Sequence, residues 1–357
     1  MPLILRVVVP VCFLVLVAGL SGCASTPTEM TYFPEGEAGT PRNWPLLPEV
    51  PRYRYAGQLV GEPNFRAAKA GQPGAAMRFL RWLAGLGAPP DTTRQLVRPQ
   101  GGWVDDAGRV YVTDVGREAV FVFDEAQSLM QVWDRADRSS HFKSPVAVIR
   151  GAGSEIYVSD SELGRVVRLD ADGSPLGSFG QGVLQRPTGL ARDAASGAVF
   201  VADSAAHDIK VFDDHGRLLR TLGHRGAGPG EFNGPTHITI HERRLIVSDT
   251  LNARVQILDF DGASLGVIGR RGLYVGNLTR PKGVAVDDDG NYYIVESYYD
   301  HLLVFDRDGN FLLPIGGTGT ALGKFFLPAG VWSDRNNRVY VADMFNGRVT
   351  IFQYLGE

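Results

Sequence analysis

The chain has 357 residues, of which 44% are hydrophobic and 21% are charged, so it can bury a sizeable core and is neither disordered nor generally membrane-embedded. Its 36 basic and 39 acidic side chains are spread along the length and leave a net charge of -3. This balance provides no basic field, so binding to nucleic acid is disfavoured.

The first 22 residues have the pattern of an export signal. Arg6 precedes an apolar run, from Val7 to Leu20, which is too short for an ordinary spanning helix but has the length of a signal-peptide core. The run closes in the letters LSGC, ending at Cys23, which resemble the lipobox of bacterial lipoproteins. The resemblance implies a signal peptide over residues 1–22 and lipidation of the Cys23 thiol. A plain signal peptide with a chance cysteine is the alternative.

Lipidation at Cys23 would attach the mature chain to a bacterial membrane, since the two or three acyl chains implied by the resemblance anchor a protein stably. Ala24 follows, where the lipoprotein pattern reserves Asp for retention at the inner membrane. We therefore expect a protein of the cell envelope that faces the periplasm or the exterior, with the outer membrane favoured in a diderm host. The only other cysteine is Cys12 in the signal, so the mature chain cannot form a disulfide.

Residues 23–51 are predicted to form a tether between the lipid and a folded domain over residues 52–357. Prolines recur through this range and aliphatic side chains are few, a composition that favours an extended spacer and cannot build a core. The prolines are Pro27, Pro34, Pro41, Pro45, Pro48 and Pro51.

Six segments of the domain begin alike, as in RPKGVAVDDDGNYYIVES from Arg280. Each has a proline near its start and a Leu or Phe three residues before that proline. The prolines are Pro99, Pro145, Pro187, Pro235, Pro281 and Pro328, and the preceding apolar residues are Leu96, Phe142, Leu184, Phe232, Leu278 and Phe325. Self-similarity at a spacing of about 46 residues is typical of a repeat architecture.

Each unit contains four short apolar runs rich in Val, Ile and Leu, which predict strands rather than helices. Residues 237–269 include all four, and the turn between the third and fourth ends in Gly, as in DFDG from Asp259. One such sheet cannot bury both of its faces, so neighbouring units must pack on each other, and radial packing gives a propeller. The predicted fold is all-β: a six-bladed propeller of four-stranded antiparallel blades over residues 98–355.

The last unit lacks a fourth strand after the run from Arg348 to Leu355, and an unpaired edge would remain exposed. The run from Tyr55 to Gly61 has the pattern of a fourth strand, so segment 53–61 is predicted to pair with the C-terminal run and close the ring. Residues 62–95 are expected to form an insertion with one amphipathic helix over residues 75–86. Its apolar face would pack on its own domain, or lie on the membrane or a partner.

The repeated pattern P-x-G-V-A-V-D, a hairpin, a strand ending in Asp, and then R-V resembles the NHL repeat. The stretch GAGPGEFNGP over residues 226–235 matches its Gly-rich lead-in. The resemblance covers residues 98–355 and implies a propeller. It departs where the repeat's arginine, present as Arg165, Arg254 and Arg348, is replaced by Ala119, Asp208 and His301, and where Glu296 replaces the Asp.

Strand order places the residue before each proline and the acid that ends each second strand on one rim. Arg98, Arg186 and Arg280 precede the proline in blades 1, 3 and 5, so they could converge over the channel. Either a nearby acid neutralises each Arg, or the three bind an anionic or carboxylate-bearing ligand. The acids recur in every blade, which favours a structural role as caps of the following turn. They are Asp114, Asp160, Asp203, Asp249, Glu296 and Asp343.

Histidines at the same rim raise the question of a metal. His207, His237 and His301 lie in three successive blades, and zinc accepts imidazole, but a histidine of a third strand should lie farther from the axis than His237. The related peptide-amidating lyases are propellers with a His-ligated zinc in the channel. Lactonase-type propellers instead hold calcium through Glu, Asn and Asp; the candidates here are Glu296, Asn252 and Asn346.

The sequence favours binding over catalysis, because it contains no serine nucleophile elbow, paired catalytic carboxylates or phosphate loop. Tyr298 and Tyr299, in a rim loop beside His301, suit recognition of a partner. The prediction is a lipid-anchored extracytoplasmic scaffold for an envelope protein, peptide or glycan, without a cofactor. The alternative is a metal-dependent hydrolase or lyase, lactonase-like or amidating-lyase-like, with zinc or calcium in the central channel. The choice rests on analogy with the fold.

Overall fold

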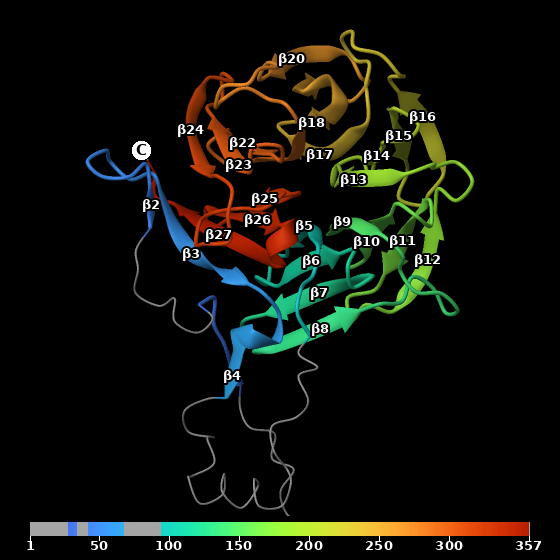
Figure 1. Cartoon of the computed structure of the whole chain (residues 1–357). Helices are drawn as coiled ribbons and strands as arrows, with labels where there is room; N and C mark the ends of the chain where they lie inside the picture. Colours follow the sequence, from blue (N-terminus) through green and yellow to red (C-terminus); the bar gives the residue numbers. More distant parts are fainter. Residues whose placement is uncertain (1–27, 34–41, 68–93, 357) are drawn as a thin grey trace, which may run out of the picture. The chain divides into compact units, whose positions relative to one another are not determined.

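The computed structural model describes residues 28–33, 42–67 and 94–356 of the chain (Figure 1). The predicted signal peptide, the lipidation site Cys23 and the predicted helix over residues 75–86 lie outside the described residues. No helix in the described part is both long and apolar enough to cross a membrane.

The chain divides into two compact units. The larger consists of Met30–Phe65 and Asp91–Glu357, and the smaller of Met1–Glu29 and Arg66–Pro90. Two short strands, β1 (Thr28–Met30) and β4 (Phe65–Ala67), pair with each other. Everything that follows concerns the larger unit.

Six antiparallel sheets form the larger unit and are arranged around a common centre, with the first strand of each innermost (Figure 1). Blades 1 to 3 consist of β5 (Pro99–Val104), β6 (Val110–Asp114), β7 (Ala119–Asp124) and β8 (Leu129–Trp133); β9 (Pro145–Arg150), β10 (Ile156–Asp160), β11 (Arg165–Leu169) and β12 (Pro175–Phe179); and β13 (Pro187–Arg192), β14 (Val199–Asp203), β15 (Asp208–Phe212) and β16 (Leu218–Leu222). Blades 4 and 5 consist of β17 (Pro235–His241), β18 (Arg244–Asp249), β19 (Arg254–Leu258) and β20 (Ser264–Ile268); and β21 (Pro281–Val286), β22 (Tyr292–Glu296), β23 (His301–Phe305) and β24 (Phe311–Gly316). The prediction of six four-stranded antiparallel blades is confirmed.

Blade 6 is completed from the other end of the chain. It contains β25 (Val331–Ser333), β26 (Arg338–Asp343) and β27 (Arg348–Tyr354), followed by β3 (Tyr53–Leu59) as the fourth strand. The register runs from Val349 opposite Leu59 to Tyr354 opposite Tyr53. The predicted closure by an N-terminal strand is therefore confirmed, and it leaves no blade with an open fourth position.

The core lies between neighbouring blades. The second strands β6, β10, β14 and β22 are buried at every residue, because both faces of each sheet are covered by the adjacent sheets. The Leu or Phe that precedes each repeated proline is also buried, and each belongs to the apolar cluster between its own blade and the one before. This position explains why the sequence repeats a large apolar residue there.

Glycine lets the innermost strands approach each other closely around the channel. A Cβ added at Gly330 would lie 2.2 Å from the carbonyl oxygen of Gln100, and one at Gly189 would lie 2.7 Å from the backbone nitrogen of Ile238. Both distances are shorter than any real carbon contact, so these positions accept only glycine without a shift of the strands.

Two parts of the predicted tether pack on the propeller instead of standing clear of it. Met30 is buried in the same apolar cluster as Leu59. The short strand β2 (Asn43–Trp44) pairs with the outer edge of β3, and the Trp44 ring meets the Phe352 ring edge to face at 5.3 Å. The expectation that residues 23–51 contribute nothing to the core does not hold for these two segments, since single apolar side chains cover the closing strand.

Candidate functional site

The antiparallel strand order places two sets of connections on one side of the propeller. First strands run away from the repeated prolines and second strands return, and the third and fourth strands repeat this course. The turns between second and third strands therefore lie on the same side as the loops that enter the next first strand. We call this side the channel face.

The acid at the end of each second strand is buried and holds one of these loops. Asp203 accepts hydrogen bonds from the backbone nitrogens of Gln185 at 2.7 Å and Arg186 at 2.8 Å. The acids that hold the loops of the other blades are Asp114, Asp160, Asp249, Glu296 and Asp343. Their contacts agree with the structural role that their recurrence indicates.

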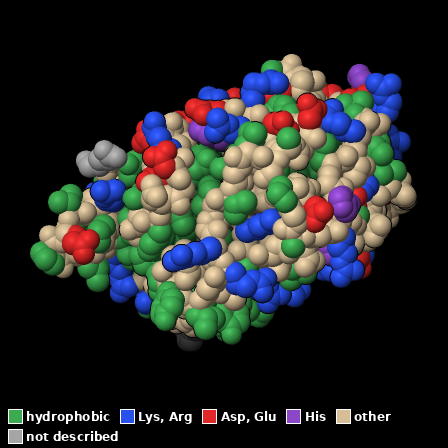
Figure 2. Space-filling view, turned by 90° about the horizontal axis from the view of Figure 1, so that it is seen from above, with side chains coloured by type: hydrophobic (Ala, Val, Ile, Leu, Met, Phe, Trp, Pro, Cys, Tyr) green, Lys and Arg blue, Asp and Glu red, His purple; other side chains and the backbone are tan. Residues whose placement is uncertain are grey.

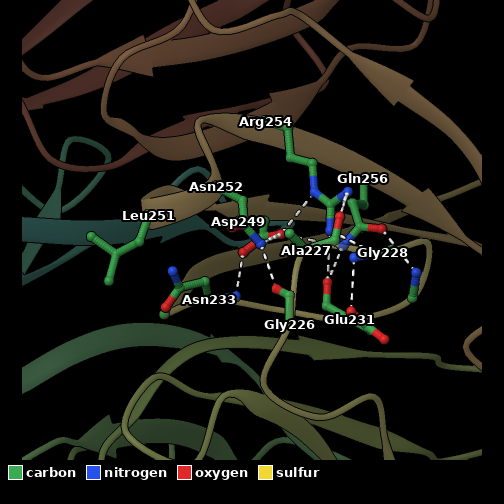
Figure 3. Close-up of polar contacts among 12 residues, drawn as sticks. Gly226, Ala227, Gly228, Glu231, Asn233, Asp249, Leu251, Asn252, Arg254 and Gln256 are labelled. Carbon is green, nitrogen blue, oxygen red and sulfur yellow. Dashed lines mark hydrogen bonds and ion pairs between the residues drawn. The ribbon is translucent and has the colours of Figure 1, made fainter.

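In blade 4 the arginine of the repeat also serves the loop (Figure 3). The Oδ2 atom of the fully buried Asp249 accepts from Arg254 Nε at 2.9 Å and from Asn252 Nδ2 at 2.8 Å. The terminal nitrogens of Arg254 donate to three backbone oxygens of the loop over residues 226–235, at 2.8 to 2.9 Å. The Leu251 side chain points away from these contacts (Figure 3). The arginine thus fixes the Gly-rich loop through all three of its side-chain nitrogens.

Blade 6 repeats this arrangement and blade 3 departs from it. Arg348 Nε donates to Asp343 Oδ2 at 2.8 Å, and its NH2 group donates to the backbone oxygen of Lys324 at 2.7 Å. In blade 3 Asp208 stands in the place of the arginine and pairs with Lys210 at 2.6 Å. The departures from the repeat noted in the sequence therefore change how a loop is held.

A cavity of about 450 Å³ opens at the centre of the channel face, and we call it the channel mouth. Every blade contributes the residue that follows its repeated proline. These residues are Gln100, Val146, Thr188, Thr236, Lys282 and Ala329. Leu251 and Thr250, from a turn between second and third strands, line it as well.

The channel mouth is positively charged. Arg186 from blade 3 and Arg280 and Lys282 from blade 5 line it, and no carboxylate is among the lining residues. Within the described residues, none of these three side chains forms an ion pair or a hydrogen bond. Asp203 and Glu296 bind the backbone N–H groups of the two arginines and not their guanidinium groups. The Arg280 charge nevertheless opposes the rise in the pKa of Glu296, so both readings of these arginines remain predictions.

His237 lines the channel mouth from blade 4. Burial lowers the pKa of His237 to about 4, so the imidazole is neutral near pH 7. Beside it, the hydroxyls of Thr236 and Thr250 lie 2.7 Å apart, and Thr250 donates to the backbone oxygen of Pro281 at 2.7 Å. Blade 4 thus places neutral groups between the cations of blades 3 and 5.

The neutral His237 should make the protein less stable in acid. The unfolded side chain has a pKa of about 6.5. Between about pH 6.5 and pH 4, the imidazole is therefore protonated in the unfolded state and neutral in the folded state. The free energy of unfolding falls as the pH falls through this window. If the His237 ring were fully shielded from water, the free energy of unfolding would fall by about 3 kcal/mol. Because His237 faces an open cavity, we expect a fall of about 1 to 2 kcal/mol. Denaturant unfolding of wild type and His237→Gln at about pH 7 and pH 4.5 measures it.

The variant should lose less stability in acid than the wild type by that amount. His215→Gln is the control, because His215 is exposed on a turn and should behave as the wild type. If the free energy of unfolding falls equally in His237→Gln and in the wild type between about pH 7 and pH 4.5, protonation of the His237 ring costs the folded state nothing.

Other residues predicted at the rim lie apart from the channel mouth. All three predicted arginines are exposed, but only Arg186 and Arg280 line the channel mouth and Arg98 does not. Glu296 is buried with both oxygens bound by backbone N–H groups, and burial raises its pKa. Tyr298 is 60% exposed, and its ring meets that of Tyr299 edge to face at 4.9 Å.

The structure does not bring the three candidate histidines together. His207 Nδ1 accepts from the backbone nitrogen of Gly234 at 3.0 Å, and neither His207 nor His301 lines the channel mouth with His237. The Asn252 amide binds Asp249 and a loop carbonyl, and Asn346 does the same in blade 6. Across the described ranges, no group of three or more His, Cys, Asp or Glu side chains is arranged to hold a metal ion.

Comparison with known proteins agrees with this architecture. A family model described as a 6-bladed β-propeller matches residues 193–277. RING finger protein nhl-1 of Caenorhabditis elegans is 28% identical over 166 residues, which are 45% of this chain and 16% of that protein. The E3 ubiquitin-protein ligase NHLRC1 of Homo sapiens is 30% identical over 106 residues, 29% of this chain and 25% of the ligase. This chain is a six-bladed β-propeller with NHL-repeat relatives.

Solved structures resemble this propeller in fold. A Bacteroides thetaiotaomicron protein of unknown function has a TM-score of 0.59 at 15% identity, over 72% of this chain and 70% of its own. A streptogramin B lyase has a TM-score of 0.53 at 12% identity, over 72% and 94%. Such low identities show the fold alone, so the lyase likeness gives no support to the hydrolase or lyase alternative.

Lys282 is the residue of the channel mouth that sequence reasoning missed. It follows the repeated proline of blade 5, at the position that faces the cavity in all six blades. The repeat alignment contained part of this signal, because the residue after each proline varies in polarity between blades, from Val146 to Lys282.

Proposed function

We propose that this protein is a lipid-anchored extracytoplasmic scaffold that captures an envelope protein, peptide or glycan on its channel face. The lipobox-like sequence ending at Cys23 supports the anchor. The relatives' NHL-type segments support a protein or peptide as the partner. The chain spans only 16% and 25% of the lengths of these relatives, so the ligase activity in one of their names is not carried over.

The observation that carries the proposal is the exposure of large apolar side chains on the channel face. Leu251 and Phe345, in turns between second and third strands, are 53% and 52% exposed, and Phe326 packs against Phe345 with ring centroids 5.5 Å apart. Tyr298 lies in the corresponding turn of blade 5. Aromatic side chains are enriched at protein interfaces, so the exposed pair of Phe326 and Phe345, together with Tyr298, favours a docking role for this face.

Charge is distributed differently on the opposite side, where the turns between first and second strands and between third and fourth strands lie. Acids gather in these turns and pair with arginines, as in Asp105 with Arg109 at 2.7 Å and Asp214 with Arg192 at 2.7 Å. In the view of Figure 2, most of the Asp and Glu side chains lie towards the upper border, and hydrophobic side chains are spread across the rest of the view. This contrast favours the channel face as the side that binds.

Cross-linking in native envelopes with the full-length chain tests the proposal. The wild type should sediment with membranes and capture a partner reproducibly, whereas Cys23→Ser should move to the soluble fraction. Tyr298→Ser combined with Phe345→Ser should reduce capture about tenfold or more, because buried aromatic side chains dominate interface energies.

The matched control is Leu265→Ser with Val267→Ser, a change of similar exposure on the outer strand β20. Capture that falls equally in the control and in the channel-face variant would refute the assignment to this face. Cys23→Ser protein that stays with the membrane would refute lipid anchoring.

A further inference from the structure

We propose that the channel mouth binds a compact polyanionic ligand, carrying at least two carboxylate or phosphate groups, between Arg186, Arg280 and Lys282. This goes beyond the scaffold function, because it names a small ligand and a site that a docked partner need not occupy. The two proposals share the channel face and Leu251, which lines the cavity and is exposed on that face.

The lining of the channel mouth has no negative side chain to balance its cations. Elsewhere in the propeller, several arginines have a carboxylate partner, as in Arg165 with Asp137 at 2.8 Å and Arg168 with Glu155 at 2.6 Å. At the channel mouth three cations converge on a cavity without any carboxylate among its lining residues. Arg186 and Arg280 are exposed, and Lys282 is half-buried. Because an unpaired, partly buried charge is costly, the Lys282 ammonium between two further cations favours a negative charge supplied from outside.

The three cationic side chains reach the cavity from two different blades. Arg186 enters from blade 3, and Arg280 and Lys282 enter from blade 5, so they lie on either side of blade 4. Guanidinium groups bind carboxylate or phosphate oxygens in pairs, and an ammonium group binds them as a point charge. The Thr236 hydroxyl donates to the backbone oxygen of Lys282 at 3.2 Å, which fixes the start of that strand beside the cavity.

The volume of the channel mouth suits a small molecule. A cavity of about 450 Å³ is of the size of small-molecule sites and is too small for a folded segment. The hydroxyl groups of Ser144, Ser204 and Thr188 line it together with the cations. Thr188 and Ser204 donate their hydroxyl hydrogens to backbone oxygens, whereas Ser144 accepts from the Ser161 hydroxyl and can donate its own hydrogen to a ligand oxygen.

Lys282 adds a property that a plain surface cation would not have. Burial lowers its pKa, and the nearby Arg280 lowers it further. A bound anion opposes both effects and raises the pKa again, so binding should take up a proton at pH values where free Lys282 is partly neutral.

Isothermal titration calorimetry of the full-length protein in detergent, at low ionic strength, tests the proposal. Citrate and inorganic phosphate are the probes, and acetate and glucose are the controls. Citrate, phosphate or both should bind saturably and raise the melting temperature, whereas acetate should bind weakly and glucose should not bind. Citrate alone would identify carboxylates as the ligand chemistry, and phosphate alone would identify phosphate. Binding of neither would overturn the proposal.

Variants locate the site. Arg186→Gln, Arg280→Gln and Lys282→Met should each weaken binding by about tenfold to a hundredfold, because each removes a charge-assisted contact. The matched control is Arg98→Gln, since Arg98 holds the same position in the repeat of blade 1 but does not line the cavity. An equal loss in Arg98→Gln would mean that binding follows the net charge of the surface and not this site.

Two further readouts separate this inference from misfolding and from the scaffold function. The melting temperatures of the ligand-free variants should match or exceed that of the wild type, because each change removes a repelled charge. Titrations in two buffers of different ionisation enthalpy should show proton uptake in the wild type and none in Lys282→Met. Partner capture is measured with the Tyr298 and Phe345 variant, in which citrate or phosphate binding should be unchanged, so either proposal can fail alone.

Discussion

Deletion of residues 53–59 should abolish the cooperative unfolding of the whole propeller and not only loosen blade 6. β3 is the sole source of a fourth strand for that blade in the described structure, and it buries Tyr53, Tyr55 and Leu59. Each of these side chains contributes about 1.5 to 3 kcal/mol on burial. The edge of β27 would also lose its partners. Since a domain has a net stability of only about 5 to 15 kcal/mol, this loss should exceed what the remaining blades can tolerate.

Circular dichroism in the near ultraviolet during thermal unfolding measures the effect. The deletion variant should lose the sharp transition, and Leu59→Ala, which keeps the strand, should lower the free energy of unfolding by about 2 to 5 kcal/mol. Leu265→Ala in β20 is the matched control, because Leu265 lies on a fourth strand of another blade but is 55% exposed, and it should change stability by less than about 1 kcal/mol. A sharp transition near the wild-type temperature in the deletion variant would show that five closed blades suffice.

The features that repeat in every blade could be predicted from the sequence, and those of a single blade could not. The buried apolar residue before each proline and the loop-holding acid occur six times, so chance patterns in one blade do not obscure them. The closing strand was predictable for the same reason, since an incomplete repeat at one end requires a matching piece at the other.

The docking of Met30 and Trp44 had no such signal. Each is a single apolar residue in a Pro-rich stretch, and the Phe352 ring that Trp44 meets lies near the other end of the chain. Average composition over a window cannot show a contact of this kind, because it depends on which distant surface is left uncovered. The propeller uses these residues to cover the outer edge of β3.

The charges of the channel mouth were predictable only in part. The sequence indicates Arg186 and Arg280 by their place before the proline, but the same rule includes Arg98, which is exposed outside the cavity. Whether a long side chain turns towards the axis depends on the loop that precedes it. The segment before blade 1 pairs near the closing strand, since Gln95 forms a bridge with Gly61. The first strands of the other blades instead follow a loop from the fourth strand of the preceding blade.

The second large effect is expected at Asp249, where Asp249→Ala should lower the free energy of unfolding by about 3 to 5 kcal/mol. The carboxylate is fully buried and accepts from Arg254, Asn252 and the backbone nitrogen of Asn233. Removing it leaves a guanidinium group without its counter-charge and a backbone N–H without an acceptor, and each costs free energy. Denaturant unfolding measures the loss. The control Asp259→Ala removes two backbone contacts from an exposed turn and should cost about 1 kcal/mol.

A double-mutant cycle separates the ion pair from the loop contacts. Arg254→Met removes the contacts to the loop over residues 226–235 as well as the pair, so it should also be strongly destabilising. The double variant should be more stable than the sum of the two losses by more than about 1 kcal/mol, because each single change leaves its partner buried alone. Additive losses would mean that Asp249 and Arg254 act independently. Faster hydrogen exchange at Asn233 and Gly234 in Asp249→Ala would place the damage in the loop that borders the channel mouth, since Gly234 lines that cavity.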